Sequence, residues 1–483
     1  MKKSFLINVG ILLGLNLVIK PVYVFGLERA VHDRLGNTSF ELYLSLFSIA
    51  VIFQIINDLG IQSYTAKKVS ADRGQINDLF TNLLAFKLVL GFVYFSILTL
   101  ASFFIGYELS AYKLLVGLGL VQFLSGGLQF LRANLAGLGY YKTDSLLSAV
   151  DRSLLIIILS VFLFSSWLTE FDLSWFIQAQ IMSMSGSVVI GFLLLRPHLG
   201  RLTYRIDLSL FKDQIKESLP YALAVLMMAL YSRLDQVMLE RMLQGSGEGG
   251  VYGMSYRLLD VLNMVGFLFA GLLLPMFSRM HAQGNPVKGL LQLSGKILLG
   301  ISITLAVTVS LVAFPLLDLM YPSLSVTEAQ AAVTPYLMGS LVMMSGGYIF
   351  GTYLVASDRL KQLNIVFLIS LILNVCLNVL WIPERGALGA AQATLITQSL
   401  VFLVEFIWVS RLKLVDHKEL TWRVLGLVGV MLVYVLWGQR YYPVEGLLPA
   451  ALVCLFIGGL AALILGLFPI KELIQVLKEK ESE

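Results

Sequence analysis

Four charged residues stand inside two long hydrophobic segments of this 483-residue chain. Arg233 and Asp235 lie in SLPYALAVLMMALYSRLDQVMLERML, and Arg257 and Asp260 lie in VYGMSYRLLDVLNMVGFLFAGLLLPMF. A charged side chain deep in a bilayer costs about 3 kcal/mol or more, so such residues usually face a protein interior or a wet cavity. Because arginine presents a planar fork of N–H donors that suits phosphate, Arg233 and Arg257 are candidate contacts for an anionic ligand.

The spacing of these four charges predicts how they are oriented. Arg257 and Asp260 are three residues apart, so they share one face of a helix and can form an ion pair. Arg233 and Asp235 are two residues apart, so their side chains point to different faces. We expect Asp235 and Asp260 to act as counter-charges or in ion coupling rather than in direct contact with the ligand.

Three further basic residues, Lys20, Lys87 and Arg152, also stand in hydrophobic segments. Lys20 precedes Pro21, which removes a helix hydrogen bond, and bent helices are common at transport sites. The alternative for Lys20 is a side chain that reaches outward past a kink. Lys87 is placed to pair with Asp58. We predict that the five bases line a cationic cavity.

Carboxylates in the same segments leave a second interpretation open. Asp58, Asp151, Asp235 and Asp260 could neutralise the bases locally and leave the cavity nearly neutral. Glu405 stands alone in a later segment, where it is either an ion-coupling carboxylate or an interface group. The carboxylates are too few to suggest a proton relay.

The composition places the chain in a membrane. Hydrophobic residues make up 58% of it and charged residues only 13%, whereas soluble domains contain about 25% charged residues. The net charge of +5 is spread over many short loops, so we expect no nucleic-acid partner. Two cysteines and four scattered histidines predict neither a disulfide framework nor a metal site. No catalytic motif is present, and we predict that the protein is not an enzyme and has no cofactor.

A spanning helix needs about 20 mostly apolar residues. We therefore predict an all-α integral membrane protein with about 14 transmembrane helices. The candidate segments are 4–27, 39–62, 79–105, 112–136, 145–167, 174–195, 213–240, 250–276, 290–314, 332–356, 361–382, 387–410, 421–438 and 447–468.

Basic residues alternate between the loops as the positive-inside rule requires. With a cytoplasmic N-terminus, 24 of the 35 Lys and Arg residues fall inside and 6 outside, and both termini are cytoplasmic. The connection Gln62–Asp78 is either an amphipathic helix on the cytoplasmic face or an ordinary basic loop. Glu240 and Arg241, at the outer end of the seventh segment, are expected to reach water.

A weak internal repeat suggests two lobes. The tripeptide Leu-Glu-Arg at 27–29 recurs at 239–241, and the longest basic loop follows the sixth segment. Many transporters consist of two such repeats with the site between them. We predict an N-terminal lobe at 1–200 (spans 1–6) and a C-terminal lobe at 201–416 (spans 7–12). Residues 417–483 then hold spans 13–14 and a cytoplasmic tail.

Two stretches resemble the polysaccharide transporter family of the multidrug/oligosaccharidyl-lipid/polysaccharide (MOP) exporter superfamily. SRLDQVMLERMLQGSGEGGVYGMSYRLLDVLNMV is similar to the seventh and eighth helices of that family, in Asp235, the apolar run 237–239, the glycine-rich turn, Tyr252 and Arg257. RLGNTSFELYLSLFSIAVIFQIINDLGIQ resembles the family's second helix, which closes here in Asp-Leu-Gly at 58–60. The resemblance covers essentially the whole length.

The resemblance implies a V-shaped two-lobe bundle that works by alternating access in the bacterial inner membrane. Its cargo would be an undecaprenyl-pyrophosphate-linked oligosaccharide such as an O-antigen unit, flipped from the cytoplasmic to the periplasmic leaflet. Arg233 and Arg257, with Lys20, would hold the pyrophosphate. Membrane lipids and other polysaccharide-assembly proteins would be partners, and a Na⁺ or H⁺ gradient would be the energy source.

Three rival functions remain open. A multidrug exporter of the same superfamily would favour an acidic or aromatic cavity, which five basic residues argue against. A peptidoglycan-precursor flippase would handle a related lipid. A membrane glycan polymerase would need a substantial outer loop with catalytic residues, and the outer loops here are short.

Overall fold

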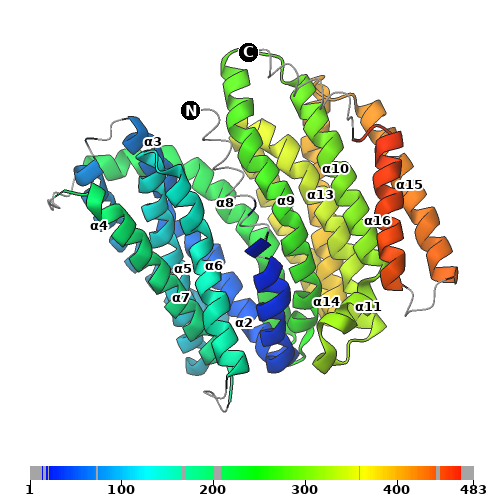
Figure 1. The fold of residues 1–483 in the computed structure, drawn as a ribbon, viewed down its shortest axis with the longest axis horizontal. Coiled ribbons are helices and arrows are strands. Elements are labelled where there is room, and N and C mark those ends of the chain that lie inside the picture. Colours follow the sequence, from blue (N-terminus) through cyan, green and yellow to red (C-terminus); the bar gives the residue numbers. More distant parts are fainter. Residues whose placement is uncertain are drawn as a thin grey trace. The chain divides into compact units, whose positions relative to one another are not determined.

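The computed structural model describes residues 21–71, 76–165, 170–200, 208–357, 359–441 and 447–468, with residues 14, 18, 19 and 74. Within these ranges every regular element is a helix and none is a strand, which confirms the all-α prediction. The contacts between residues divide the chain into two compact units, Met1–Gly250 and Val251–Glu483. Figure 1 labels the main helices of each unit.

Unit 1 is a bundle in which α2, α4, α5 and α7 pack against one another, and α8 packs along α2. Val237 of α8 belongs to the same apolar core as Phe40 and Tyr43 of α2. Its elements are η1 (Val22–Glu28, a π-helix), α2 (Arg29–Asp58), α3 (Ile61–Ala71), α4 (Ile76–Ile105), α5 (Leu109–Gly137), α6 (Tyr141–Phe164), α7 (Leu173–Leu195), η3 (Arg196–His198) and α8 (Leu208–Met242).

Unit 2 has α13 at its centre, between α10 and α14, and α15 and α16 pack beside α10 (Figure 1). Its elements are α9 (Glu248–Ala282, of which 251 onward belongs to this unit), α10 (Lys288–Leu311), α11 (Ala313–Met320), η4 (Pro322–Leu324), α12 (Glu328–Ala331), α13 (Val333–Ala356), α14 (Leu360–Arg411), α15 (His417–Tyr441) and α16 (Leu447–Ile464). The short elements α11, η4 and α12 lie in a connection for which the sequence predicted no helix.

Eleven helices in the described part of the chain are long and apolar enough to cross a membrane. The predicted segments 361–382 and 387–410 both fall in α14, which counts once, and the stretch Pro449–Ile464 of α16 is shorter than a full span. Most of the first predicted segment, 4–27, lies outside the described residues. These spans confirm the multi-pass membrane architecture. A helix suits the bilayer because its backbone N–H and C=O groups bond to one another and need no water.

Helix α14 bends at the boundary that the sequence predicted between two segments. Gly386 has a non-helical backbone (φ 54°, ψ −133°), and Pro383 stands just before it. A Cβ atom on Gly389 would lie 2.6 Å from the carbonyl oxygen of Trp381, so the chain turns back tightly here. Glycine at 386 accommodates a positive φ that other residues rarely adopt.

Of the two alternatives for the connection Gln62–Asp78, the structure has the helix, α3. Ile61, Thr65 and Val69 are fully buried on one face. A Cβ atom on Gly137 of α5 would lie 2.8 Å from the Cβ of Val69, so α3 is packed tightly against the bundle. Lys68 on the other face is exposed.

The predicted three-part division at residues 200 and 416 stays a prediction. Helix α8 belongs to unit 1, because α8 packs on α2.

Candidate functional site

The polar face of α9 carries an ion pair in unit 2. Arg257 Nη1 donates to Asp260 Oδ2 at 3.1 Å, as the spacing of three residues allows. The side chain of Arg257 is 10% exposed and that of Asp260 is 28% exposed. The cation therefore lies on the packed side of the pair and the carboxylate on the more open side.

Asn263, which the sequence did not single out, follows this pair on α9 and bonds to Tyr348 of α13. Asn263 Nδ2 donates to the hydroxyl of Tyr348 on α13 at 3.0 Å. A Cβ atom on Gly266 would lie 2.5 Å from the ring of Tyr348, so only glycine allows the ring this close to α9. Asn263 follows Asp260 by three residues, and this helical spacing was the signal that could have revealed it.

Helix α8 turns its polar residues toward α2 within unit 1. Asp235 is fully buried, whereas Arg233 is half-buried. The next residue, Gln236, accepts a hydrogen bond from Ser48 of α2 at 2.9 Å. The difference in burial agrees with the prediction that Arg233 and Asp235 point to different faces.

The prediction that Glu240 reaches water is wrong. Glu240 is only 6% exposed, because neighbouring donors replace the water around its carboxylate. Tyr107 donates to Glu240 Oε2 at 3.0 Å, and Arg241 donates through Nε at 2.6 Å and through Nη2 at 2.5 Å. The Arg241 guanidinium also lies 4.2 Å from the centroid of the Tyr107 ring. Burial raises the pKa of Tyr107, so its hydroxyl keeps its proton and remains a donor to Glu240.

A second buried carboxylate, Glu41 of α2, holds the glycine-rich turn. Its oxygens accept from the backbone N–H of Gly247 at 3.1 Å and of Gly249 at 2.9 Å. Glu41 is 1% exposed, and Ser45 and Ser48 lie four and seven residues further along the same face. Polar residues at this helical spacing in an apolar segment could have predicted a buried polar contact, which sequence analysis missed.

Lys87 of α4 lies at the end of α2, as the sequence suggested. Its Nζ donates to the carbonyl oxygen of Asn57 at 3.1 Å, and Asp58 is near enough to interact electrostatically. Lys87 is 2% exposed, and a Cβ atom on Gly126 of α5 would lie 3.0 Å from its Nζ. A cation at the carbonyl end of a helix is favourable, so these contacts fix the junction of α2, α4 and α5.

Replacing Lys87 should destabilise unit 1. In Lys87→Met the half-buried Asp58 loses a neighbouring cation, and the Asn57 carbonyl loses a charged donor, a hydrogen bond worth about 1.5–3 kcal/mol. The thermal midpoint in detergent, at a fixed scan rate, should fall clearly and should recover in part when Asp58→Asn is added. Lys113→Met removes an exposed lysine of α5 as the control. Equal midpoints for Lys87→Met and Lys113→Met would contradict the structural role.

Arg152 of α6 contacts the beginning of the chain's described part. Its Nε lies 3.5 Å from Asp151 Oδ2, and its guanidinium lies 4.8 Å from the centroid of the Tyr23 ring in η1. Glu28 of η1 adds a further electrostatic interaction. Lys20, the remaining predicted base, lies outside the described residues.

Three of the predicted bases therefore have a carboxylate neighbour within their own unit. Lys87 is matched by Asp58, Arg152 by Asp151, and Arg257 by Asp260. This pattern favours the alternative in which the bases are neutralised locally. The convergence of these bases on one cavity, and their contact with a ligand, stay predictions.

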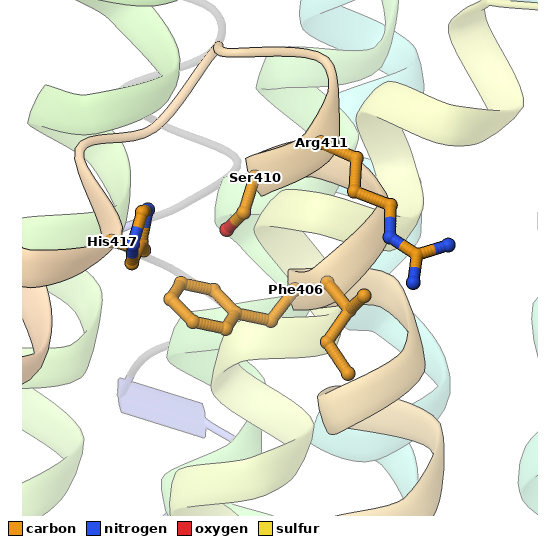
Figure 2. A pocket seen from close by; sticks show the side chains of 5 residues that line it. Phe406, Ser410, Arg411 and His417 are labelled. Atoms are coloured by element: carbon orange, nitrogen blue, oxygen red, sulfur yellow. The ribbon is translucent and has the colours of Figure 1, made fainter.

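Glu405 of α14 is 2% exposed and faces α13. A groove of roughly 270 Å³ lies near the end of the same helix, lined by Phe406, Ile407, Ser410, Arg411 and His417. Figure 2 shows Phe406 and Ser410 on the side of His417, while the Arg411 guanidinium points away from them. No predicted site residue lines this groove. Among the described residues, no three His, Cys, Asp or Glu side chains are grouped closely enough to hold a metal ion.

The apolar helices, with charged side chains inside their spans, define a multi-pass membrane protein. Residues 6–281, more than half of the chain, match the family model described as "Polysaccharide biosynthesis protein". The chain belongs to this family. No curated protein sequence matches it.

Solved structures with a similar fold are transporters of the MOP superfamily. The lipid II flippase MurJ, in an inward closed conformation, matches with a TM-score of 0.67 and 16% identity over 95% of this chain and 99% of that one. An inward-facing MATE family multidrug resistance transporter has a TM-score of 0.63 and 14% identity over 86% and 99% of the two chains. A MOP superfamily transporter from Pyrococcus furiosus, described as having a binding pocket of reverse polarity, has a TM-score of 0.56 and 15% identity over 86% and 95%. At these identities the likeness concerns the fold, which agrees with the predicted MOP architecture.

Proposed function

We propose that this protein moves an undecaprenyl-pyrophosphate-linked oligosaccharide from the cytoplasmic to the periplasmic leaflet of the bacterial inner membrane by alternating access. The observation that carries the proposal is the ion pair of the buried Arg257 with the partly exposed Asp260, inside a span of a member of the polysaccharide biosynthesis protein family. The excess of basic residues in alternate loops supports cytoplasmic termini.

The chemistry of α9 suits a phosphorylated glycan. The Arg257 guanidinium carries five N–H donors in a fork, and Nη1 is the one that reaches Asp260. A pyrophosphate competes with Asp260 for this cation, so Asp260 would hold Arg257 in place until the cargo arrives. The amide of Asn263 and the hydroxyl of Tyr348 are neutral groups that can hydrogen-bond sugar hydroxyls.

The Arg257–Asp260 pair argues against one rival function but not against the other. A peptidoglycan precursor carries a related pyrophosphate, so the arginine site alone does not distinguish the two flippases. A drug exporter for organic cations would need its carboxylates free of arginine, whereas Asp260 is paired with Arg257. Membrane lipids surround the protein in either case, and other polysaccharide-assembly proteins are further proposed partners.

The test follows the lipid-linked glycan in cells that lack the protein. We expect undecaprenyl-pyrophosphate glycan to accumulate in the cytoplasmic leaflet, by leaflet-resolved labelling, while surface polysaccharide is lost. Accumulation of the peptidoglycan precursor with normal surface glycan would replace the proposed cargo. Normal distribution of both lipids, with new sensitivity to cationic drugs, would overturn the flippase proposal.

A further inference from the structure

Glu405 is a carboxyl group enclosed between two helices of unit 2. It lies in a notch of α13 formed by Gly347 and Gly351, where a Cβ atom would be 3.3 Å from Oε2 and 2.6 Å from Oε1, respectively. The rings of Phe350, Phe402 and Phe406 form a contiguous aromatic cluster on the same two helices. Glu405 is 2% exposed, and Oε2 is fully enclosed without a hydrogen-bond partner in the described part of the chain.

In the part of the chain that the structure describes, no basic side chain pairs with Glu405. Among the described residues it takes part in no ion pair, and α13 contains no Asp, Glu, Lys, Arg or His. On α10, Lys296 is paired with Glu419 of α15 at 3.2 Å. The other titratable groups with described side chains on the helices of unit 2 around this junction are Lys288 of α10; Tyr336, Tyr348 and Tyr353 of α13; Lys361, Cys376, Glu384, Arg385 and Arg411 of α14; His417, Lys418, Arg423 and Tyr434 of α15; and Tyr252, Tyr256, Arg257, Asp260, Arg279 and His281 of α9. None of them bonds to Glu405 within the described ranges.

An isolated carboxylate in such surroundings is unstable in its charged form. Burying an unpaired charge costs far more than burying the neutral acid, so a carboxyl with no cation beside it takes up a proton. A metal cation is a poor substitute here, because it needs several oxygen ligands and, among the described residues, no group of three His, Cys, Asp or Glu side chains could hold one. We infer that Glu405 binds a proton between α13 and α14, and that release of this proton drives the two helices apart.

This inference deepens the proposed function, because it names the coupling ion of the transport cycle. Ionised Glu405 needs water or a cation, which the notch between Gly347 and Gly351 does not admit while α13 and α14 are in contact. Deprotonation therefore requires the junction to open, and closure requires a proton. A groove lined by Phe406, the residue that follows Glu405 in the chain, lies near this end of α14 (Figure 2).

Infrared spectroscopy of the protein in lipid nanodiscs tests the protonation directly. We expect the carbonyl band of a protonated carboxyl at neutral pH, its loss in Glu405→Gln, and its persistence in Glu384→Gln, which alters an exposed carboxyl of the same helix. Gly351→Ala should displace the carboxyl and shift the band without removing it. A spectrum in which Glu405→Gln removes no such band would overturn the inference.

Coupling is tested in proteoliposomes that contain lipid-linked glycan. An imposed pH gradient should drive flipping by the wild type but not by Glu405→Gln, which mimics the protonated state permanently. Flipping by Glu405→Gln at the full rate under the pH gradient, or flipping by the wild type under a sodium gradient only, would overturn the coupling role. If the wild type flips no lipid-linked glycan under either gradient, the proposed cargo is wrong. The protonation of Glu405 is then still judged by the infrared spectrum.

Discussion

Arg257→Glu should abolish flipping of the lipid-linked glycan while leaving the protein inserted in the membrane. The reversed charge repels both Asp260, whose carboxylate now lies 3.1 Å from Arg257 Nη1, and the pyrophosphate of the proposed cargo. The milder Arg257→Gln removes one charge-assisted contact worth about 1.5–3 kcal/mol, which lowers the rate roughly 10- to 150-fold. The measurement is glycan flipping per inserted protein in proteoliposomes.

A double variant separates a ligand contact from a structural ion pair. Arg257→Gln together with Asp260→Asn leaves no buried charge, so the thermal midpoint should return close to that of the wild type. If Arg257 only balances Asp260, flipping should return as well, and the proposed contact with phosphate would be refuted. We expect stability to recover and flipping to stay low. Arg257→Lys keeps the charge but loses the fork, and should fall between wild type and Arg257→Gln.

Glu41→Gln should cause a large loss of stability in unit 1. The carboxylate accepts from the backbone N–H groups of Gly247 and Gly249 at once, whereas a glutamine offers one acceptor and turns an N–H₂ donor toward the other N–H. A hydrogen bond to a charged group contributes about 1.5–3 kcal/mol, so losing one of two bonds and creating a donor clash should cost at least that much. The readout is the thermal midpoint in detergent at a fixed scan rate.

Two comparisons make the Glu41 result specific. Glu108→Gln alters an exposed carboxyl at the start of α5 whose side chain makes no capping hydrogen bond, and should leave the midpoint unchanged. Glu41→Asp keeps the charge but shortens the side chain by one methylene, so it should lie between Glu41→Gln and wild type. A midpoint for Glu41→Gln equal to that of Glu108→Gln would show that the clamp on the turn contributes nothing.

Local sequence patterns predicted most of the helices and their boundaries. Apolar runs of the right length predicted most of the helices, and the break before Gly386 was visible as Pro-Glu-Arg-Gly between two apolar segments. The pair Arg257–Asp260 followed from a spacing of three residues on one helix. The neighbourhood of Lys87 and Asp58 followed from their similar predicted depth.

Contacts between segments far apart in the sequence could not be predicted from local patterns. Glu240 looked like an interfacial residue because its partners, Tyr107 and Ser45, stand 133 and 195 residues earlier in the chain. The clamp of Glu41 spans 206 and 208 residues, and its donors are backbone groups that no side-chain pattern reveals.

By itself the sequence determined the class of this protein: a multi-pass helical membrane protein with charges placed inside its spans. Hydrophobic length and helical spacing decide these properties, and both are local. Tertiary structure alone decided what surrounds a buried charge that has no partner on its own helix. The pair Arg257–Asp260 could be predicted from spacing, whereas the glycine notch of α13 and the aromatic rings near Glu405 could not. The cost of burying a charge depends on what surrounds it in space, and packing sets those surroundings.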